Sequence, residues 1–377
     1  MRRQDVRLLI QVGASVIVLY TALGLFAGPD LKHFLFPWFA QIRETGPVAV
    51  FAAPFSNYTP PYLYLLSAAS VLGLSPLFTI KLVSVLATFW LALAVRRLLI
   101  TLGSDRHDEA AAISLLLPTV FLNGPFLGQC DALWVACCLY AVAAAVQKRT
   151  FVMAAWAGLG FAIKAQALFL APFALALVVR ERKWAALLIP PAVYLLAIIP
   201  AWLAGWPLAD LLMIYVGQVE YTHWLSTAPN LWALPAIFAP KGSPELFLAA
   251  TFATIVAVVA FVWRFPQRPL LAAALFSAIL VPWLLPKMHE RYLLLADLLS
   301  FCLAYVDRRG IPIFLAVQTG SLLSLFAYAT NFDPLNVAGS FAMTFALLAT
   351  GRLLFVLPPA GDEKAITAAA APGSAPR

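Results

Sequence analysis

The chain has 377 residues, of which 63% are hydrophobic and only 11% are charged. A soluble domain carries about a quarter charged residues because its surface faces water, so this composition excludes an ordinary soluble protein. The net charge of +8 comes from short basic clusters between apolar stretches, which is typical of membrane proteins and excludes a nucleic-acid-binding face.

The N-terminal segment is basic, and the apolar run that follows continues to about Phe26 without a cleavage site. This pattern predicts a retained first helix rather than a signal peptide. Since a spanning helix needs about 20 apolar residues, we expect about 12 helices in one membrane domain, residues 1–357, and a disordered cytoplasmic tail, residues 358–377. The predicted spans are 8–27, 76–99, 109–124, 127–147, 150–164, 166–180, 184–204, 244–263, 269–286, 291–306, 311–330 and 337–357.

Lys and Arg residues gather at alternate ends of these runs. Eighteen of the 25 fall on one side and seven on the other, which predicts that both termini are cytoplasmic. Residues 150–180 are barely long enough for two crossings at about 1.5 Å per residue. They could form one helix or a tight pair, and the charge pattern favours a pair that turns near Lys164.

Two segments on the predicted outer side are too long for turns. Residues 28–75 contain an amphipathic stretch, Leu31 to Ile42, and residues 205–243 contain several Trp and Tyr among polar residues. Both compositions are typical of helices that lie at the level of the lipid headgroups.

Polar residues at the outer helix ends are candidate site residues, because a Lys or Arg at the membrane centre costs about 2.5–3.5 kcal/mol on insertion scales. Asp30, just beyond the first span, could be a general base that takes a proton from a hydroxyl or a helix N-cap. Gln129 and Asp131 follow Gly128 and could hydrogen-bond hydroxyls, with capping again the alternative.

Lys164 and Gln166 interrupt an apolar stretch. A functional lysine is favoured there, and a snorkelling lysine is the alternative. Asn57 and Tyr58 precede a double proline and could line the same cavity or serve as ordinary turn residues.

His289, Glu290 and Arg291 place three ionisable groups at an outer boundary. Arg with a forked set of donors and a neighbouring His suit a phosphate, and Glu290 could orient either one; an interfacial salt bridge is the alternative. A carboxylate with such cations suggests a displacement that releases a prenyl phosphate, whose developing charge the cations would stabilise. One base and direct displacement predict inversion. No zinc, P-loop or dinucleotide motif occurs, so no nucleotide and no bound zinc are expected.

Several motifs resemble those of the C-type (GT-C) integral membrane glycosyltransferases, over roughly residues 8–357. The chain resembles in particular bacterial proteins similar to the mannosyltransferase that adds the second mannose in glycosylphosphatidylinositol assembly. The motifs are Pro29-Asp30 with Trp38, Ser56-Asn57-Tyr58-Thr59-Pro60-Pro61-Tyr62, Gly128-Gln129-Cys130-Asp131, Lys164-Ala165-Gln166 with Pro172, and Leu285-Pro286-Lys287-Met288-His289-Glu290-Arg291-Tyr292.

The resemblance implies a GT-C fold and an inverting transfer of a monosaccharide, with mannose favoured, from a polyprenyl phosphate to a glycan, lipid or protein hydroxyl. The reaction would take place on the non-cytoplasmic face of the inner membrane. Asp30 would be the base. The donor phosphate would bind Lys164, His289 and Arg291, and the remaining substrate contacts would come from Gln129, Asp131, Gln166, Asn57, Tyr58 and Glu290. Because Asp30 lacks the second acid of the DxD or ExD pair in some relatives, we expect no cofactor and favour a metal-free site, with a divalent cation left open.

A transporter or flippase of a lipid-linked or anionic solute is the alternative function. Such proteins also contain many helices, broken helices and intramembrane charges. Their sites lie near the midplane and their halves are often related by symmetry, whereas here the polar groups gather at one face and no internal repeat is evident. The transferase is therefore favoured.

Overall fold

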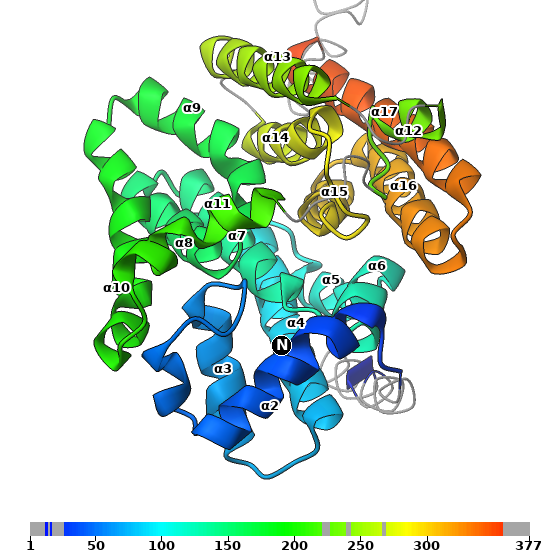
Figure 1. The fold of residues 1–377 in the computed structure, drawn as a ribbon. Helices are drawn as coiled ribbons and strands as arrows, with labels where there is room; N and C mark the ends of the chain where they lie inside the picture. Colours follow the sequence, from blue (N-terminus) through cyan, green and yellow to red (C-terminus); the bar gives the residue numbers. More distant parts are fainter. Residues whose placement is uncertain are drawn as a thin grey trace, which may run out of the picture.

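The computed structural model describes residues 12–13, 16, 26–220, 227–238, 243–265 and 269–356 (Figure 1). These residues form helices joined by turns, and none of them is in a strand, which confirms the predicted all-α class. Most of the predicted first span, 8–27, and the predicted tail, 358–377, lie outside the described residues.

The segment 28–75, predicted to lie on the outer side, folds into short helices. Its elements are η1 (Leu31–Leu35), α2 (Phe36–Thr45), η2 (Ala49–Ala52) and α3 (Pro60–Ser70). Helix α2 buries Trp38, Phe39 and Ile42 and leaves its other side exposed, which is the expected pattern of an amphipathic helix. Helices α2 and α3 both contact α4 (Pro76–Thr101), the long helix that follows them.

Helix α7 (Asp131–Val146) lies at the centre of the fold (Figure 1). Only Tyr140 and Val146 escape full burial, as expected for a helix that is apolar on all sides. Its neighbours are α4, α8 (Thr150–Ile163), α14 (Leu270–Leu284) and α15 (Leu294–Val306).

One predicted span is broken, and residues 150–180 form the pair of helices that the charge pattern favours. Residues 109–124 bend by 49° between α5 (His107–Ser114) and the pair α6 (Pro118–Phe121) and η3 (Leu122–Phe126). The break lies at residues 115–117, and Pro118 follows it as the first residue of α6, because proline lacks the N–H that a continuous helix needs. Residues 150–180 form two helices, α8 and α9 (Ala171–Glu181), joined by η4 (Ala165–Leu170), and Lys164 is extended between them.

The remaining elements surround this core. They are η5 (Trp184–Leu188), α10 (Ile189–Ala204), α11 (Leu208–Glu220), α12 (Ala233–Phe238), α13 (Pro244–Trp263), α16 (Gly310–Thr330) and α17 (Asp333–Phe355). Among the described residues, five helices are long and apolar enough to cross a membrane, or six if the bent pair is one span. Helices α10 and α13 also expose many large apolar side chains. Because these side chains and the long apolar helices need a lipid environment, the chain is an integral membrane protein.

Five further apolar helices are shorter, at 10–17 residues. Four of them have one end beside the same recess. Helices α7 and α15 begin there, and helices α8 and α14 end there. The predicted spans 127–147 and 291–306 therefore start too early, because residues 127–130 and 285–293 form irregular turns. The shortened helices leave a recess lined by these turns.

Candidate active site

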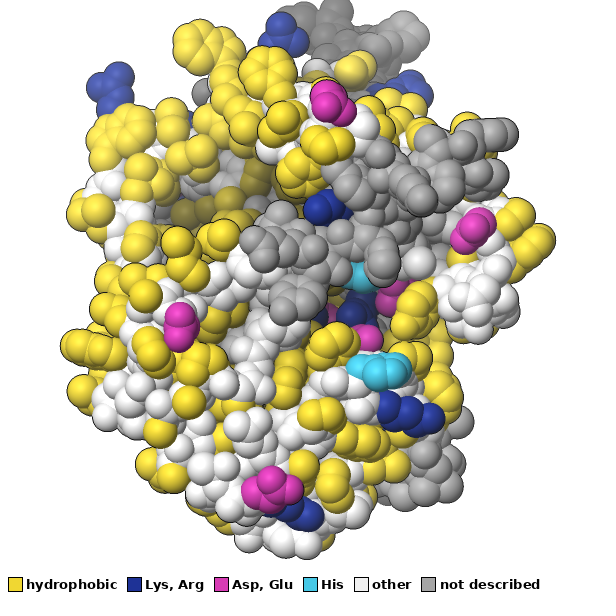
Figure 2. All heavy atoms as spheres, in the orientation of Figure 1, with side chains coloured by type: hydrophobic (Ala, Val, Ile, Leu, Met, Phe, Trp, Pro, Cys, Tyr) yellow, Lys and Arg dark blue, Asp and Glu magenta, His cyan; other side chains and the backbone are white. Residues whose placement is uncertain are grey.

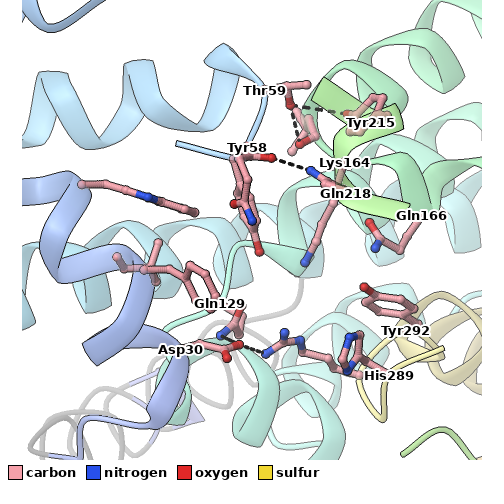
Figure 3. A pocket seen from close by; sticks show the side chains of 16 residues that line it. Asp30, Tyr58, Thr59, Gln129, Lys164, Gln166, Tyr215, Gln218, His289 and Tyr292 are labelled. Carbon is pink, nitrogen blue, oxygen red and sulfur yellow. Dashed lines mark hydrogen bonds and ion pairs between the residues drawn. The ribbon is translucent and has the colours of Figure 1, made fainter. Parts of the chain in front are cut away.

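A pocket of about 240 Å³ occupies this recess. It is lined by the start of the segment 28–75, the turns at 57–59 and 129, the break at Lys164, helix α11 and the loop between α14 and α15 (Figure 3). In the space-filling view, acidic, basic and histidine side chains lie together in a hollow of an otherwise largely apolar face (Figure 2). The structure thus brings together segments from across the whole sequence.

Asp30 stands at the N-terminus of η1, but its side chain caps no helix N–H. Its Oδ2 instead pairs with the Arg291 guanidinium and accepts a hydrogen bond from Gln129 Nε2 at 3.1 Å. No described residue donates to Oδ1, and Asp30 lines the pocket. Burial raises the pKa of Asp30, but the charge and hydrogen bond of Arg291, helped by Lys164 and His289, lower the pKa below its ordinary value overall.

Arg291 lies in the loop after α14, with its side chain 13% exposed. Its Nε is buried and has no hydrogen-bond partner among the described residues. An unpartnered buried donor is costly, and a bound anion would satisfy it.

The loop that carries Arg291 is held by the segment before α12. Asn230 Nδ2 donates to Pro282 O at 3.1 Å and to Leu285 O at 3.0 Å, and Trp232 Nε1 donates to Leu284 O at 2.7 Å. These contacts satisfy carbonyls at the C-terminal end of α14, where the helix itself provides no donors.

His289 lines the pocket, whereas Glu290 does not. The Glu290 carboxylate is buried, accepts a hydrogen bond from Thr227 and lies 3.9 Å from His289 Nδ1. The geometry therefore does not provide the direct substrate contact predicted for Glu290, because this residue does not line the pocket and its Oε2 faces Thr227 and His289. Burial lowers the pKa of His289; Arg291 and Lys164 act in the same direction, while Glu290 and Asp30 oppose them.

Lys164 lines the pocket and forms a buried ion pair with Asp131. The distance between Lys164 Nζ and Asp131 Oδ1 is 2.6 Å, and the two side chains are 7% and 0% exposed. Trp134 Nε1 also donates to Asp131 Oδ1, at 2.8 Å. Lys164 is thus too buried to be a snorkelling lysine. The substrate contact predicted for Asp131 is not provided either, because its carboxylate lies behind Lys164 and holds it.

The pocket is also lined by amides and aromatic rings. Asn57 Oδ1 and Gln166 Oε1 are buried acceptors without a described partner, and both residues line the pocket. The ring of Tyr58 lies 5.1 Å from that of Trp38, centroid to centroid. Unpartnered acceptors suit the hydroxyl donors of a sugar.

Two lining residues, Tyr215 and Gln218 on α11, were missed at the sequence level. Gln218 Nε2 donates to Asn57 O at 2.5 Å, and Tyr215 Oη donates to Phe161 O at 2.5 Å. The available signal was their spacing, because polar residues three apart lie on the same side of an otherwise apolar helix.

The described residues hold no group of three His, Cys, Asp or Glu side chains that could bind a metal ion. The expectation of a metal-free site stays a prediction.

Three comparisons with known proteins bear on this pocket. The family model described as glycosyltransferase family 87 matches residues 55–286, more than half of the chain. A crystal structure of ArnT from Cupriavidus metallidurans bound to undecaprenyl phosphate aligns with a TM-score of 0.48 at 11% identity, over 92% of this chain and 77% of that one. A likeness at this level is too weak to support a conclusion. No curated protein matches the chain significantly.

Proposed function

Because the chain belongs to glycosyltransferase family 87, we propose that the pocket transfers a monosaccharide from a polyprenyl phosphate to an acceptor hydroxyl, with inversion. The observation that supports the proposal is the contact between Asp30 and Arg291, because a carboxylate suits a general base and a guanidinium suits a phosphate. The same proposal includes the GT-C architecture, a pocket on the non-cytoplasmic side and mannose as the favoured sugar. The closer relation to the second mannosyltransferase of glycosylphosphatidylinositol assembly stays a prediction.

The donor phosphate would bind Arg291, His289 and Lys164. Arg291 offers its unpartnered Nε, and a neutral His289 offers a ring N–H. Asn57 and Gln166 would receive hydroxyls of the sugar, because their free oxygens line the same pocket.

A lipid donor is supported by a second cavity of about 710 Å³, lined by apolar residues of α8, η4, α9 and α10. Phe161 and Leu168 line this cavity, and Ile163, Lys164 and Gln166 between them line the polar pocket. A prenyl chain could therefore lie in the apolar cavity while its phosphate reaches the cations.

In the proposed reaction, Asp30 Oδ1 takes the proton of the acceptor hydroxyl as that oxygen attacks the anomeric carbon. The bond from this carbon to the phosphate oxygen breaks, and its electron pair leaves with the phosphate. In the unliganded pocket Arg291 neutralises Asp30 and weakens it as a base. A phosphate that draws Arg291 towards itself would make Asp30 more basic, so the base would become competent when the donor is bound.

The transporter alternative has no comparable support. The polar groups form one pocket at the ends of short helices, and the family is one of transferases.

The direct test uses purified protein in nanodiscs with radiolabelled polyprenyl-phosphate mannose, glucose, galactose and arabinose, and a lipid extract of the native membrane as acceptor. We expect one donor to label an acceptor, and nucleotide sugars to label none. Parallel reactions with EDTA and with Mg²⁺ or Mn²⁺ test the metal-free prediction. Labelling from nucleotide sugars alone would refute the lipid donor.

A further inference from the structure

Lys81 is a buried cation that the proposed reaction does not use. It lies in the spanning helix α4, is 5% exposed, and no described carboxylate pairs with it. Burying a charged group within a membrane span costs free energy, so the contacts that compensate this cost indicate the role of Lys81. Lys81 Nζ donates to Pro125 O at 2.9 Å and to Phe126 O.

These two carbonyls complete the hydrogen bonding at the end of η3. The carbonyls of Leu122, Asn123 and Gly124 accept from the N–H groups of Leu127, Gln129 and Gly128, respectively. Those of Pro125 and Phe126 accept from Lys81 instead. A cation is well suited to this position, because the C-terminal end of a helix carries partial negative charge.

Helix α4 holds the following turn at a second point. Ser84 Oγ, one helical turn after Lys81, donates to Gln129 O at 2.7 Å. The turn passes through Gly128 at φ +67°, where a Cβ atom would lie 3.0 Å from Leu31 Cδ1. The residue beside Asp30 therefore packs directly on the turn that Lys81 and Ser84 hold.

The turn then reaches the proposed base. Gln129 Nε2 donates to Asp30 Oδ2 at 3.1 Å, which leaves Oδ1 without a described donor. We propose that Lys81 is a positioning residue, which fixes the turn 127–130 and, through the Gln129 amide, holds Asp30 in the orientation needed to accept a proton. The positional claim rests on contacts alone, and its catalytic meaning rests on the proposed glycosyl transfer.

The test compares Lys81→Met, which removes the donors, with Lys81→Arg, which keeps them. Arg96→Met is the matched control, because Arg96 is a cation of the same helix that pairs with Asp108 far along the chain from this turn. We expect Lys81→Met to lower kcat on the order of 100-fold, the cost of misplacing a reacting group by about 1 Å, with donor KM little changed. Lys81→Arg should recover most of the loss, and Arg96→Met should turn over like the wild type.

A double-mutant cycle separates positioning from general stability. If Lys81 acts through Gln129, then Lys81→Met should cost little in a Gln129→Ala background, since the link is already cut. Additive losses, or a wild-type kcat in Lys81→Met, would overturn the proposal. Ser84→Ala, which removes the second contact to the turn, carries the same test if Lys81→Met does not fold.

A readout without substrate keeps this proposal separate from the transferase proposal. Cys130, buried in the same turn, reports its opening through the rate of alkylation, followed by peptide mass spectrometry. Alkylation should be faster in Lys81→Met and unchanged in Arg96→Met; equal rates in all variants would overturn the positional claim. A wild type that uses no donor but shows this pattern would refute the transferase and leave Lys81 as the support of the turn.

Discussion

Replacing Asp30 by Asn tests both proposed roles of its carboxylate. The change keeps the size of the side chain and removes its charge and its ability to accept a proton. A general base contributes about 10²–10⁴-fold to the rate, so kcat should fall by about that factor. Donor binding should change in the opposite direction, because Arg291 no longer has a carboxylate partner.

The size of this second effect follows from the ion pair. Two unit charges about 4 Å apart interact by about 4 kcal/mol at an effective dielectric constant of 20. The Asp30 side chain is 28% exposed, so water screens the pair towards the 0.2–1 kcal/mol or so of exposed pairs. A value of about 1–2 kcal/mol lies between these limits and corresponds to donor binding about 5–30-fold tighter in Asp30→Asn.

The assay measures the Kd of a polyprenyl phosphate by isothermal titration in nanodiscs, and kcat at saturating donor. Glu44→Gln is the control, because Glu44 is an exposed carboxylate at the far end of α2 and should affect neither quantity. Unchanged turnover in Asp30→Asn would remove Asp30 as the base. An unchanged or weaker Kd would show that the carboxylate and the phosphate do not compete for Arg291.

Three further outcomes are expected. Lys164→Met strands the fully buried Asp131 carboxylate and should lower the free energy of unfolding by about 3–5 kcal/mol. Denaturation in detergent measures the free energy of unfolding. The double variant Lys164→Met/Asp131→Asn should recover most of the lost stability. A Lys164→Met variant as stable as the wild type would contradict the buried ion pair. The lowered pKa of Asp30 keeps the base ionised above the ordinary value of about 3.9, so kcat/KM should not fall between about pH 8 and pH 5. The stability from this pair is present above the unfolded-state pKa and is lost as pH falls through the folded-state pKa; an acid limb above about pH 5 would argue against Asp30. Met288→Cys should react with an impermeant maleimide from the non-cytoplasmic side only, against a background of four buried native cysteines, and labelling from the cytoplasm would overturn the topology.

Sequence patterns predict the chemical types at this site well, because charges in a membrane protein are rare enough to stand out. The patterns do not predict which of these charged side chains form ion pairs with each other. Asp30 and Arg291 are 261 positions apart, and nothing in either motif indicates that they neutralise each other. Asp131 and Lys164 were assigned to different substrate groups, whereas the fold makes them partners.

Helix ends are a second limit. The predicted spans include residues 127–130 and 291–293, and they therefore extend α7 and α15 too far at their N-terminal ends. Tertiary contacts, such as those of Lys81 with the end of η3, add to the local preference of Gly128 for a turn. Tyr215 and Gln218 were missed because the segment 205–243 was expected to lie at the level of the lipid headgroups, whereas its helix α11 lines the pocket.

The contact between Asp30 and Arg291 also bears on how a catalytic cycle would end. In the proposed transfer the spent carrier would be a phosphate monoester with more negative charge than the diester donor, so it would bind the guanidinium tightly and inhibit the enzyme. Once the proton has passed to water, the aspartate regains its charge and competes for the same guanidinium. The Asp30 carboxylate would then promote release of the spent lipid phosphate, so that a new donor molecule would not be needed to displace it.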